Sequence, residues 1–229
     1  MRKHYPWLWF DADNTLFDYN QSECIALKKA FQLIDAPFND DYLDTYRQIN
    51  RQLWLALEKH EITPSLLQIR RFELLMEATQ LSYSANQLGK IYVEQLAYCA
   101  ELIDGAHDVL HALHKTCRFA IVTNGLQDVQ RSRVAHSPIR DYISELIISE
   151  EIGVAKPKDA FFVAASARLG NPAKSDILMI GDSLTSDMRG GVDYGIDTCW
   201  YNPLGEPRPA DIRLTYEIAH LRELLEMLE

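Results

Sequence analysis

The chain begins with a short hydrophobic segment that ends at two acidic residues. Residues 7–10 read WLWF and are followed by DADNT. A run of four bulky apolar residues is typical of a strand that is buried on both faces of a parallel sheet. Because side chains alternate along an extended chain, we expect Asp11 and Asp13 to point to one side and Ala12 to the other. Asn14 tolerates the positive φ that a sharp turn requires.

Residues 20–101 follow a different pattern, in which apolar side chains recur at intervals of three and four positions. One such series is Leu66, Ile69, Phe72, Leu75 and Met76. This spacing is typical of amphipathic helices. Thr63 followed by Pro64 is a favourable helix start, because threonine caps a helix and proline fits its first turn. The segment therefore predicts a bundle of about four helices.

After residue 105 short apolar runs alternate with helical patterns. The predicted strands are Arg118–Thr123, Leu146–Ser149, Ile177–Gly181 and Thr198–Tyr201, and the predicted helices are His107–His114, Leu126–Ser137, Lys158–Leu169, Ser183–Tyr194 and Ala219–Leu228. Strands that alternate with helices of this length indicate βαβ units and a parallel sheet.

These patterns predict an α/β protein with a Rossmann-like, doubly wound parallel sheet and an inserted all-α helical domain. The α/β core comprises residues 1–17 and 102–229, and the helical insert, or cap, comprises residues 18–101. The insert leaves the chain directly after the first strand, at the carboxyl edge of the sheet. Open α/β sheets bind their ligands at that edge.

Composition narrows the choice of partners. The chain has 229 residues, of which 47% are hydrophobic and 24% charged, and its formal net charge is −10. An acidic protein of this kind is a poor partner for nucleic acid or for an anionic membrane surface, and we expect neither. A small anion remains possible as ligand, since one metal ion or one cation can reverse the field inside a cleft. The sequence leaves open whether the protein is a monomer or a homodimer.

Cysteine usage and hydropathy indicate the compartment. The four cysteines are scattered, without a CxxC pair, and we interpret them as reduced and mostly buried thiols. The first ten residues contain no apolar stretch long enough for a signal peptide, and no run approaches a membrane span. We therefore expect a soluble, cytoplasmic protein.

Polar residues follow several of the predicted strands at their carboxyl ends. These residues are TNG at 123–125, Lys156 in VAKP, and GDSLTSD at 181–187. In a doubly wound sheet such strand ends meet in one crevice. The crevice would then contain Asp11, Asp13, Thr123, Lys156, Asp182 and Asp187. Four carboxylates share a dry pocket only if a cation balances them, and oxygen ligands of this kind suit Mg²⁺.

Each feature taken singly has an ordinary structural explanation. Asp182 would cap the following helix, and Asp187 would be a carboxylate in the first turn of that helix, where the helix dipole favours negative charge. Thr123 would merely end a strand, and Lys156 would be a solvated surface residue. A bare DxD sequence is also common in solvated turns. Their joint occurrence, in this order and at successive strand ends, favours a functional site.

The same residues resemble the motifs of the haloacid dehalogenase (HAD) superfamily of phosphatases. The four motifs correspond to DADNT at 11–15, TNG at 123–125, Lys156 in VAKP, and GDSLTSD at 181–187. The helical insert lies where one branch of that superfamily carries its cap. The runs FDAD, IVTNG and ISEEIGVAKP, and INRQLW in the insert, resemble the YjjG-type pyrimidine 5′-nucleotidases more specifically.

The resemblance implies roles for individual residues. Asp11 would be the nucleophile that forms an aspartyl-phosphate. Asp13 would protonate the leaving oxygen and later deprotonate the hydrolytic water. Thr123 and the backbone of Asn124 would hold phosphate oxygens, and Lys156 would neutralise the phosphoryl group and keep Asp11 ionised.

The resemblance also implies Mg²⁺ as cofactor. Its ligands would be Asp11, the backbone carbonyl of Asp13, and Asp182, with Asp187 acting through water or from the next layer. The substrate would be a small phosphorylated metabolite, a nucleoside monophosphate such as UMP, dUMP or dTMP.

Other functions have to be weighed. A dehalogenase would not need a proton donor at Asp13. A HAD phosphatase could instead act on a sugar phosphate. A phosphomutase would keep Asp13 but would need a sugar-phosphate cap and would retain the phosphoryl group, so its product would be an isomerised sugar phosphate instead of free phosphate. A receiver-type signalling domain also groups carboxylates, threonine and lysine around Mg²⁺, but there the lysine comes last, whereas Lys156 precedes Asp182. A catalytically inactive binding module would have little reason to retain all the motif positions.

Overall fold

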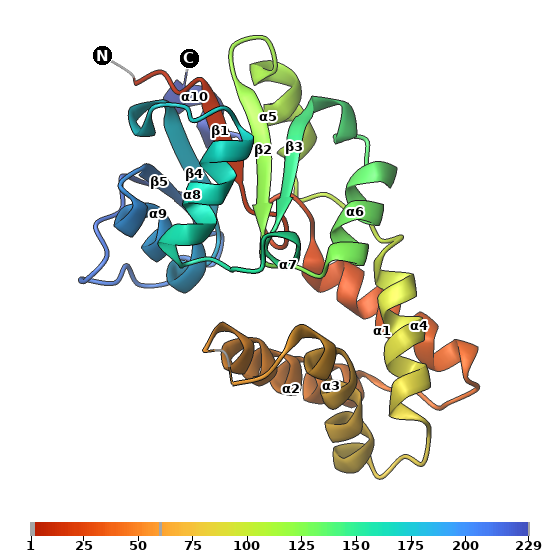
Figure 1. Ribbon diagram of the computed structural model, residues 1–229. Helices are drawn as coiled ribbons and strands as arrows, with labels where there is room; N and C mark the ends of the chain where they lie inside the picture. Colours follow the sequence, from red (N-terminus) through yellow and green to blue (C-terminus); the bar gives the residue numbers. More distant parts are fainter. Residues whose placement is uncertain (1–2, 60, 229) are drawn as a thin grey trace. The chain divides into compact units, whose positions relative to one another are not determined.

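A computed structural model describes residues 3–59 and 61–228 (Figure 1). The chain forms two compact units. The first contains the segment up to Tyr19 and the segment from Ala100 onward, and the second contains Asn20–Cys99.

The first unit is built on one parallel sheet. Within the described residues its strands lie in the order β3-β2-β1-β4-β5-β6, and every neighbouring pair is parallel. The strands are β1 (Trp7–Phe10), β2 (Arg118–Thr123), β3 (Ile143–Ile148), β4 (Ile177–Gly181), β5 (Asp197–Tyr201) and β6 (Tyr216–Ile218). The central strand β1 is hydrogen-bonded to β2 on one side and to β4 on the other, so the chain reverses its direction of winding there. The predicted doubly wound sheet is confirmed.

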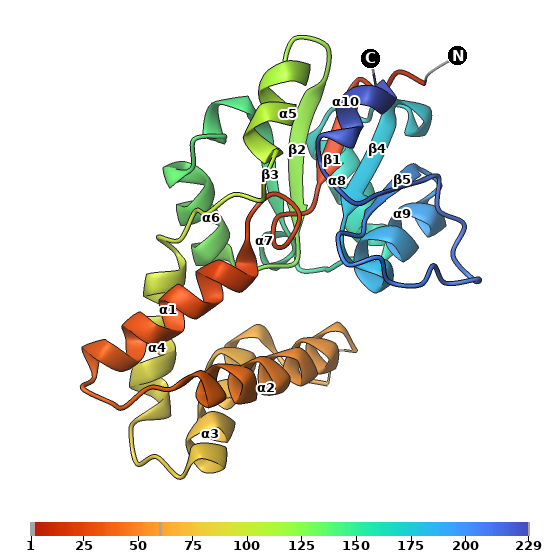
Figure 2. The ribbon, with the colours of Figure 1, turned by 180° about the vertical axis from the view of Figure 1, so that it is seen from behind.

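Helices cover both faces of this sheet, as Figures 1 and 2 show from opposite sides. The α-helices of this unit are α5 (Ala106–Leu113), α6 (Gln127–His136), α7 (Ser149–Ile152), α8 (Asp159–Arg168), α9 (Arg189–Tyr194) and α10 (Glu223–Leu228), and its other helical segments are the 3₁₀ helices η1 (Arg140–Tyr142) and η2 (Lys174–Asp176) and the π-helix η3 (Leu184–Met188). Leu8 and Phe10 of β1 pack toward α5, α6 and α10, whereas Trp7 and Trp9 pack toward α8 and α9. The alternation of one strand thus supplies both cores.

The second unit is a bundle of helices, as the spacing of its apolar residues predicts. They are α1 (Tyr19–Leu33), α2 (Asp40–Glu58), α3 (Pro64–Thr79) and α4 (Ala85–Leu96). Thr63 caps α3 by accepting a hydrogen bond from the N–H of Leu66 at 3.2 Å, and Pro64 opens the helix. Three buried rings from three helices pack together in the interior, with centroids 5.3–5.4 Å apart: Tyr46, Phe72 and Tyr92.

Several element boundaries differ from those expected. Strand β3 begins at Ile143, three residues before the predicted start at Leu146. The first half of the strand is only partly buried and includes an exposed serine, so it does not form an apolar run in the sequence. The predicted helix from Ser183 to Tyr194 consists of η3 followed by α9. Strand β6, which the pattern did not reveal, has only three residues and pairs with β5, and the final helix begins at Glu223 rather than at Ala219. The four cysteines form no disulfide in the described ranges.

Among the helices of the described residues, none has the length and apolar character needed to cross a bilayer.

Candidate active site

The predicted polar residues lie at the carboxyl ends of the central strands. Asp11 directly follows β1, Thr123 ends β2, and Asp182 directly follows β4. Lys156 lies in the loop between α7 and α8, and Asp187 lies in η3. Parallel strands bring these positions to one edge of the sheet, although up to 176 residues separate them along the chain.

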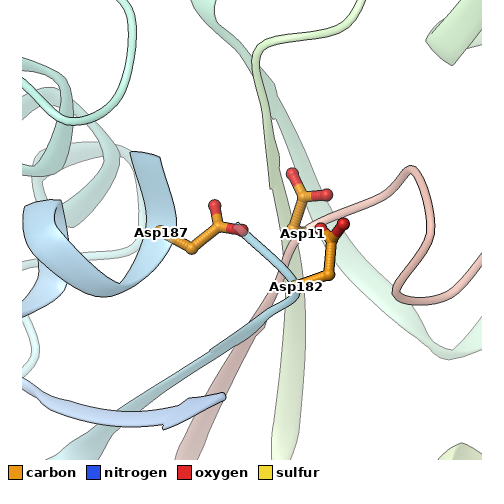
Figure 3. A group of neighbouring side chains, drawn as sticks. All are labelled: Asp11, Asp182 and Asp187. Atoms are coloured by element: carbon orange, nitrogen blue, oxygen red, sulfur yellow. The ribbon is translucent and has the colours of Figure 1, made fainter. Parts of the chain in front are cut away.

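Three carboxylates converge at this edge (Figure 3). Asp11, Asp182 and Asp187 each place one oxygen within 4.8 Å of the others. Asp187 is fully buried and Asp11 nearly so. Like charges at such separations repel each other strongly in a medium of low dielectric constant. A cluster of this kind needs a compensating charge.

Lys156 supplies part of that charge. Its ammonium group is buried and donates hydrogen bonds to Oδ1 of Asp11 at 2.6 Å, to Oδ1 of Asp187 at 2.7 Å and to the carbonyl of Val122 at 2.6 Å. Burial alone would lower the pKa of Lys156, but the two carboxylates outweigh it and hold that pKa above its usual value. Lys156 is therefore charged at neutral pH and fixed in place by three acceptors.

The charge of the cluster is still not balanced. With all three carboxylates ionised, the one ammonium group leaves an excess of two negative charges. Burial raises the pKa of Asp11 to about 7, with Lys156 opposing and Asp187 reinforcing the shift. Burial also raises the pKa of Asp182, and the charges of Asp11 and Asp187 raise it further. A divalent cation with a preference for oxygen ligands fits this donor set in charge and in chemistry, as Mg²⁺ does.

Glycine and backbone groups position the two aspartates that follow β4. A Cβ atom on Gly181 would lie 2.2 Å from Oδ2 of Asp187, so only glycine leaves room for that carboxylate. The same oxygen accepts the N–H of Ser183 at 3.1 Å. The indole N–H of Trp200 donates to the carbonyl of Asp182 at 2.9 Å. The missing side chain of Gly181 and these hydrogen bonds thus fix the positions of Asp182 and Asp187 at the end of β4.

The TNG segment holds the loop that carries Lys156. The amide side chain of Asn124 exchanges two hydrogen bonds with the backbone of Lys156, each of 2.9 Å. The hydroxyl of Thr123 accepts the N–H of Gly125 at 3.0 Å. The side chain of Asn124 therefore positions the lysine, a contact that its expected role through backbone N–H groups did not include. The peptide bond between Lys156 and Pro157 is cis.

Asp13 lies outside the cluster of three carboxylates. Its side chain accepts a hydrogen bond from the amide of Gln130 at 2.7 Å and pairs with the guanidinium of Arg133, both on α6. Ala12 is fully buried, and Asn14 has the positive φ expected of it, 57°. Neither Gln130 nor Arg133 was among the residues predicted for the site. Their spacing of three residues on a predicted helix was the available signal, because it places both on one face.

Comparisons with known proteins agree with this arrangement. Residues 7–195 match the family model described as haloacid dehalogenase-like hydrolase. The chain belongs to this family. This hydrolase is 34% identical in sequence to "Pyrimidine 5'-nucleotidase YjjG" of Escherichia coli over 224 residues, which cover 98% of each of the two chains. It is 33% identical to "Pyrimidine 5'-nucleotidase PynA" of Streptococcus pneumoniae, over 98% of this chain and 95% of that one.

A solved structure is also close to this hydrolase. It is a crystal structure of the putative HAD-hydrolase YfnB of Bacillus subtilis, described as bound to magnesium. The two chains are 34% identical, align with a TM-score of 0.93, and cover 99% of this chain and 100% of that one. The predicted family is therefore confirmed.

Proposed function

We propose that this hydrolase is a Mg²⁺-dependent 5′-nucleotidase that removes phosphate from pyrimidine nucleoside and deoxynucleoside monophosphates. The observation that carries the chemistry is the buried ammonium of Lys156 between Asp11 and Asp187, in a cluster of three carboxylates that one ammonium group cannot balance when all three are ionised. Support for the substrate comes from the similarity over nearly the whole chain to proteins named pyrimidine 5′-nucleotidases.

The first half-reaction transfers the phosphoryl group to Asp11. A carboxylate oxygen of Asp11 forms a bond to phosphorus, and the bond between phosphorus and the nucleoside oxygen breaks. Asp13 gives its proton to that leaving oxygen, which departs as the nucleoside hydroxyl. Lys156 favours the ionised form of Asp11, which burial would otherwise disfavour, and it offsets charge on the phosphoryl group.

The second half-reaction releases phosphate. Asp13, now ionised, takes a proton from a water molecule whose oxygen bonds to phosphorus, and the bond between phosphorus and Asp11 breaks. The hydroxyl of Thr123 and the backbone N–H of Asn124 would hold the phosphoryl oxygens during both steps. Substrate and water are thereby converted to nucleoside and phosphate, and Asp11 and Asp13 return to their starting states.

Mg²⁺ would be held by Asp11, Asp182 and Asp187, together with the backbone carbonyl of Asp13. When bound, it neutralises negative charge on the phosphoryl group and on the surrounding carboxylates. The residues present fit this ion, because they supply hard oxygen ligands and an unbalanced charge of two.

The remaining assignments complete the proposal. Residues 1–17 and 102–229 form the catalytic core, and residues 18–101 form a cap that contributes to the choice of substrate. The enzyme acts in the cytoplasm on a small metabolite, as a monomer or homodimer, without nucleic acid or membrane as partner.

A panel of phosphate esters tests the function. UMP, dUMP and dTMP should be hydrolysed faster than purine nucleotides and sugar phosphates, and EDTA should abolish all turnover. Asp11→Asn should release phosphate at least about 10³-fold more slowly, because the amide is a poor nucleophile. Asp141→Asn, an exposed aspartate of the same unit, is the matched control and should keep full activity.

Two results would contradict the proposal. Equal turnover of sugar phosphates would remove the nucleotidase assignment and favour the sugar-phosphate alternative, and an isomerised product would indicate a mutase. Undiminished activity of Asp11→Asn would remove the covalent mechanism.

A further inference from the structure

Helix α6 engages both carboxylate oxygens of Asp13. The amide nitrogen of Gln130 donates to Oδ2 at 2.7 Å, and Nη1 of Arg133 donates to Oδ1. Gln130 and Arg133 are almost fully buried, at 1% and 0% exposure, whereas the side chain of Asp13 remains 27% exposed. The donors thus approach Asp13 from the interior and leave its outer side open. We propose that Gln130 and Arg133 are positioning residues that orient the Asp13 carboxylate for proton transfer, an inference that rests on the proposed phosphatase chemistry.

The surroundings of Arg133 indicate that stability alone does not explain it. Its guanidinium is buried, yet Nε and Nη2 have no hydrogen-bond partner among the described residues. Burying a charged group with unsatisfied donors is costly, and an apolar side chain of similar size would avoid that cost. What the guanidinium does contact is the turn after β1, at the carboxylate of Asp13 and over the ring of Phe17 at 5.3 Å.

The turn that Arg133 contacts is short and internally bonded. The N–H of Asn14 donates to the carbonyl of Phe17 at 2.7 Å, and the N–H of Phe17 donates to the carbonyl of Ala12 at 2.9 Å. Arg133 therefore contacts both ends of this hydrogen-bonded turn, the carboxylate of Asp13 at one end and the ring of Phe17 at the other. This arrangement restricts the backbone and the side chain of Asp13 together.

Gly125 makes the contact of Gln130 possible. A Cβ atom at position 125 would lie 2.2 Å from Nε2 of Gln130, the atom that donates to Asp13. Gly125 also donates its N–H to Thr123, in the segment assigned to hold phosphate. The side chain of Gln130 thus extends across the TNG segment to Asp13, so the group that transfers the proton is held against the segment that holds the phosphoryl group.

The contacts suit the proton transfers that Asp13 performs. When Asp13 gives up its proton to the leaving oxygen, negative charge develops on its carboxylate, and two donors already face it. Each carboxylate oxygen has a second lone-pair direction, so one hydrogen bond at each still leaves an oxygen able to face the leaving group or the water. General acid–base catalysis contributes about 10²–10⁴-fold and is sensitive to misplacement by about 1 Å.

A double-mutant cycle between Asp13 and Arg133 tests the inference. Arg133→Met should lower kcat for UMP by about 10- to 100-fold, with KM changed less than about twofold. On an Asp13→Ala background the same substitution should change the rate less than about twofold, because its effect passes through Asp13. A loss of equal size on both backgrounds would overturn the inference.

The leaving group provides a second measurement. p-Nitrophenolate is weakly basic and leaves with little help from an acid. The single-turnover release of p-nitrophenolate from p-nitrophenyl phosphate should therefore fall less than about threefold in Arg133→Met, while release of uridine from UMP falls as above. A structural defect would slow both releases alike, and that outcome would overturn the inference.

Further variants separate positioning from folding. Arg133→Lys keeps the charge and should recover part of the loss. Gln130→Met provides the same cycle if Arg133→Met does not fold. Arg131→Met is the matched control, since Arg131 lies on the same helix but pairs with Glu151 on the surface at 2.7 Å, and its kcat should be unchanged.

Failure of the proposed function has a different signature. If the wild-type protein with Mg²⁺ hydrolyses neither UMP nor p-nitrophenyl phosphate, the proposed function and this inference are both overturned. If the wild-type protein is active and the cycle is additive, only the positioning role is overturned.

Discussion

Both units of the molecule bury charged side chains, and they balance them differently. In the helical unit the carboxylate of Glu23 is 2% exposed and accepts hydrogen bonds from Arg47 at 2.8 Å and from Asn50 at 3.4 Å. The guanidinium of Arg71 lies nearby, 4.7 Å from the ring centroid of Tyr92. In the helical unit the negative charge of Glu23 is therefore balanced by arginines of the same chain.

In the α/β unit three carboxylates lie together, those of Asp11, Asp182 and Asp187, and the ammonium group of Lys156 pairs with Asp11 and Asp187. A buried cluster that the chain balances by itself can serve structure alone, although such pairs add little net stability. A cluster with an excess of negative charge requires a cation that the chain itself does not supply. The difference between the two units distinguishes a structural ion pair from a binding site, and three experiments test it.

The largest effect is expected from removing the lysine. Lys156→Met leaves buried carboxylates without their cation, and the free energy of unfolding without Mg²⁺ should fall by about 3–5 kcal/mol. Phosphate release should slow by about 10²–10³-fold. Urea unfolding and steady-state kinetics measure the two effects. Lys158→Met, two residues later and exposed, should stay within about 0.5 kcal/mol of wild type. Equal stability of the two variants would contradict the charge argument.

An intermediate effect is expected from the metal. Mg²⁺ at a hundred times its Kd should raise the free energy of unfolding by about 2.7 kcal/mol, because it binds only the folded cluster. Asp182→Asn should remove most of this gain, whereas Asp193→Asn, an exposed aspartate on α9, should retain it. Thermal unfolding with and without Mg²⁺ measures the gain. If Asp182→Asn responded as strongly as wild type, Asp182 would not be a ligand.

The smallest effect is expected in the helical unit. Burial raises the pKa of Glu23 above its usual value near 4.5, although Arg47 opposes the shift. Between these two pKa values the folded protein binds more protons than the unfolded chain, so the stability contributed by Glu23 is present below about pH 4.5 and is lost as the pH rises through its folded pKa. Glu23→Gln should lack this dependence.

The magnitude of that effect is small because burial and ion pairing oppose each other. At pH 7 we expect Glu23→Gln to change the free energy of unfolding by about 1 kcal/mol or less. Glu73→Gln, the exposed partner of Arg70, serves as control and should leave the pH profile unchanged. Urea unfolding between pH 4 and pH 7 measures both profiles. A parallel profile for Glu23→Gln would show that Glu23 is not the titrating group.

The sequence predicted best those strands whose interior positions are all apolar. The bounds of β1, β2 and β4 coincide with the predicted runs, because a strand buried on both faces has no polar residue within it to obscure the pattern, and in β2 only the end residues are polar. β6 escaped prediction because three residues, YEI, carry no periodicity that distinguishes a strand from a loop. Its pairing with β5 is a tertiary contact, which local patterns do not encode.

The candidate site was predictable in its members and less so in their contacts. Strand ends in a doubly wound sheet bring Asp11 and Asp182 together whatever the details of the loops. The position of Lys156 depends in addition on its loop, which the side chain of Asn124 holds. The hydrogen bonds of Asp13 could not be anticipated in the same way. Glutamine and arginine on a helix are usually solvated, so the spacing that places Gln130 and Arg133 on one helix face did not indicate that this face is buried.

The indole of Trp200 has a use that catalysis does not require. Its N–H donates a hydrogen bond to the main-chain carbonyl oxygen of Asp182, and the residue is buried, with 2% of its surface exposed. Because this indole is hydrogen-bonded to Asp182, we expect a cation at the neighbouring carboxylates to change the intrinsic fluorescence of the protein. Binding of the proposed Mg²⁺ should therefore be measurable as a change in fluorescence, and Trp200→Phe should remove the part of the change that comes from Trp200.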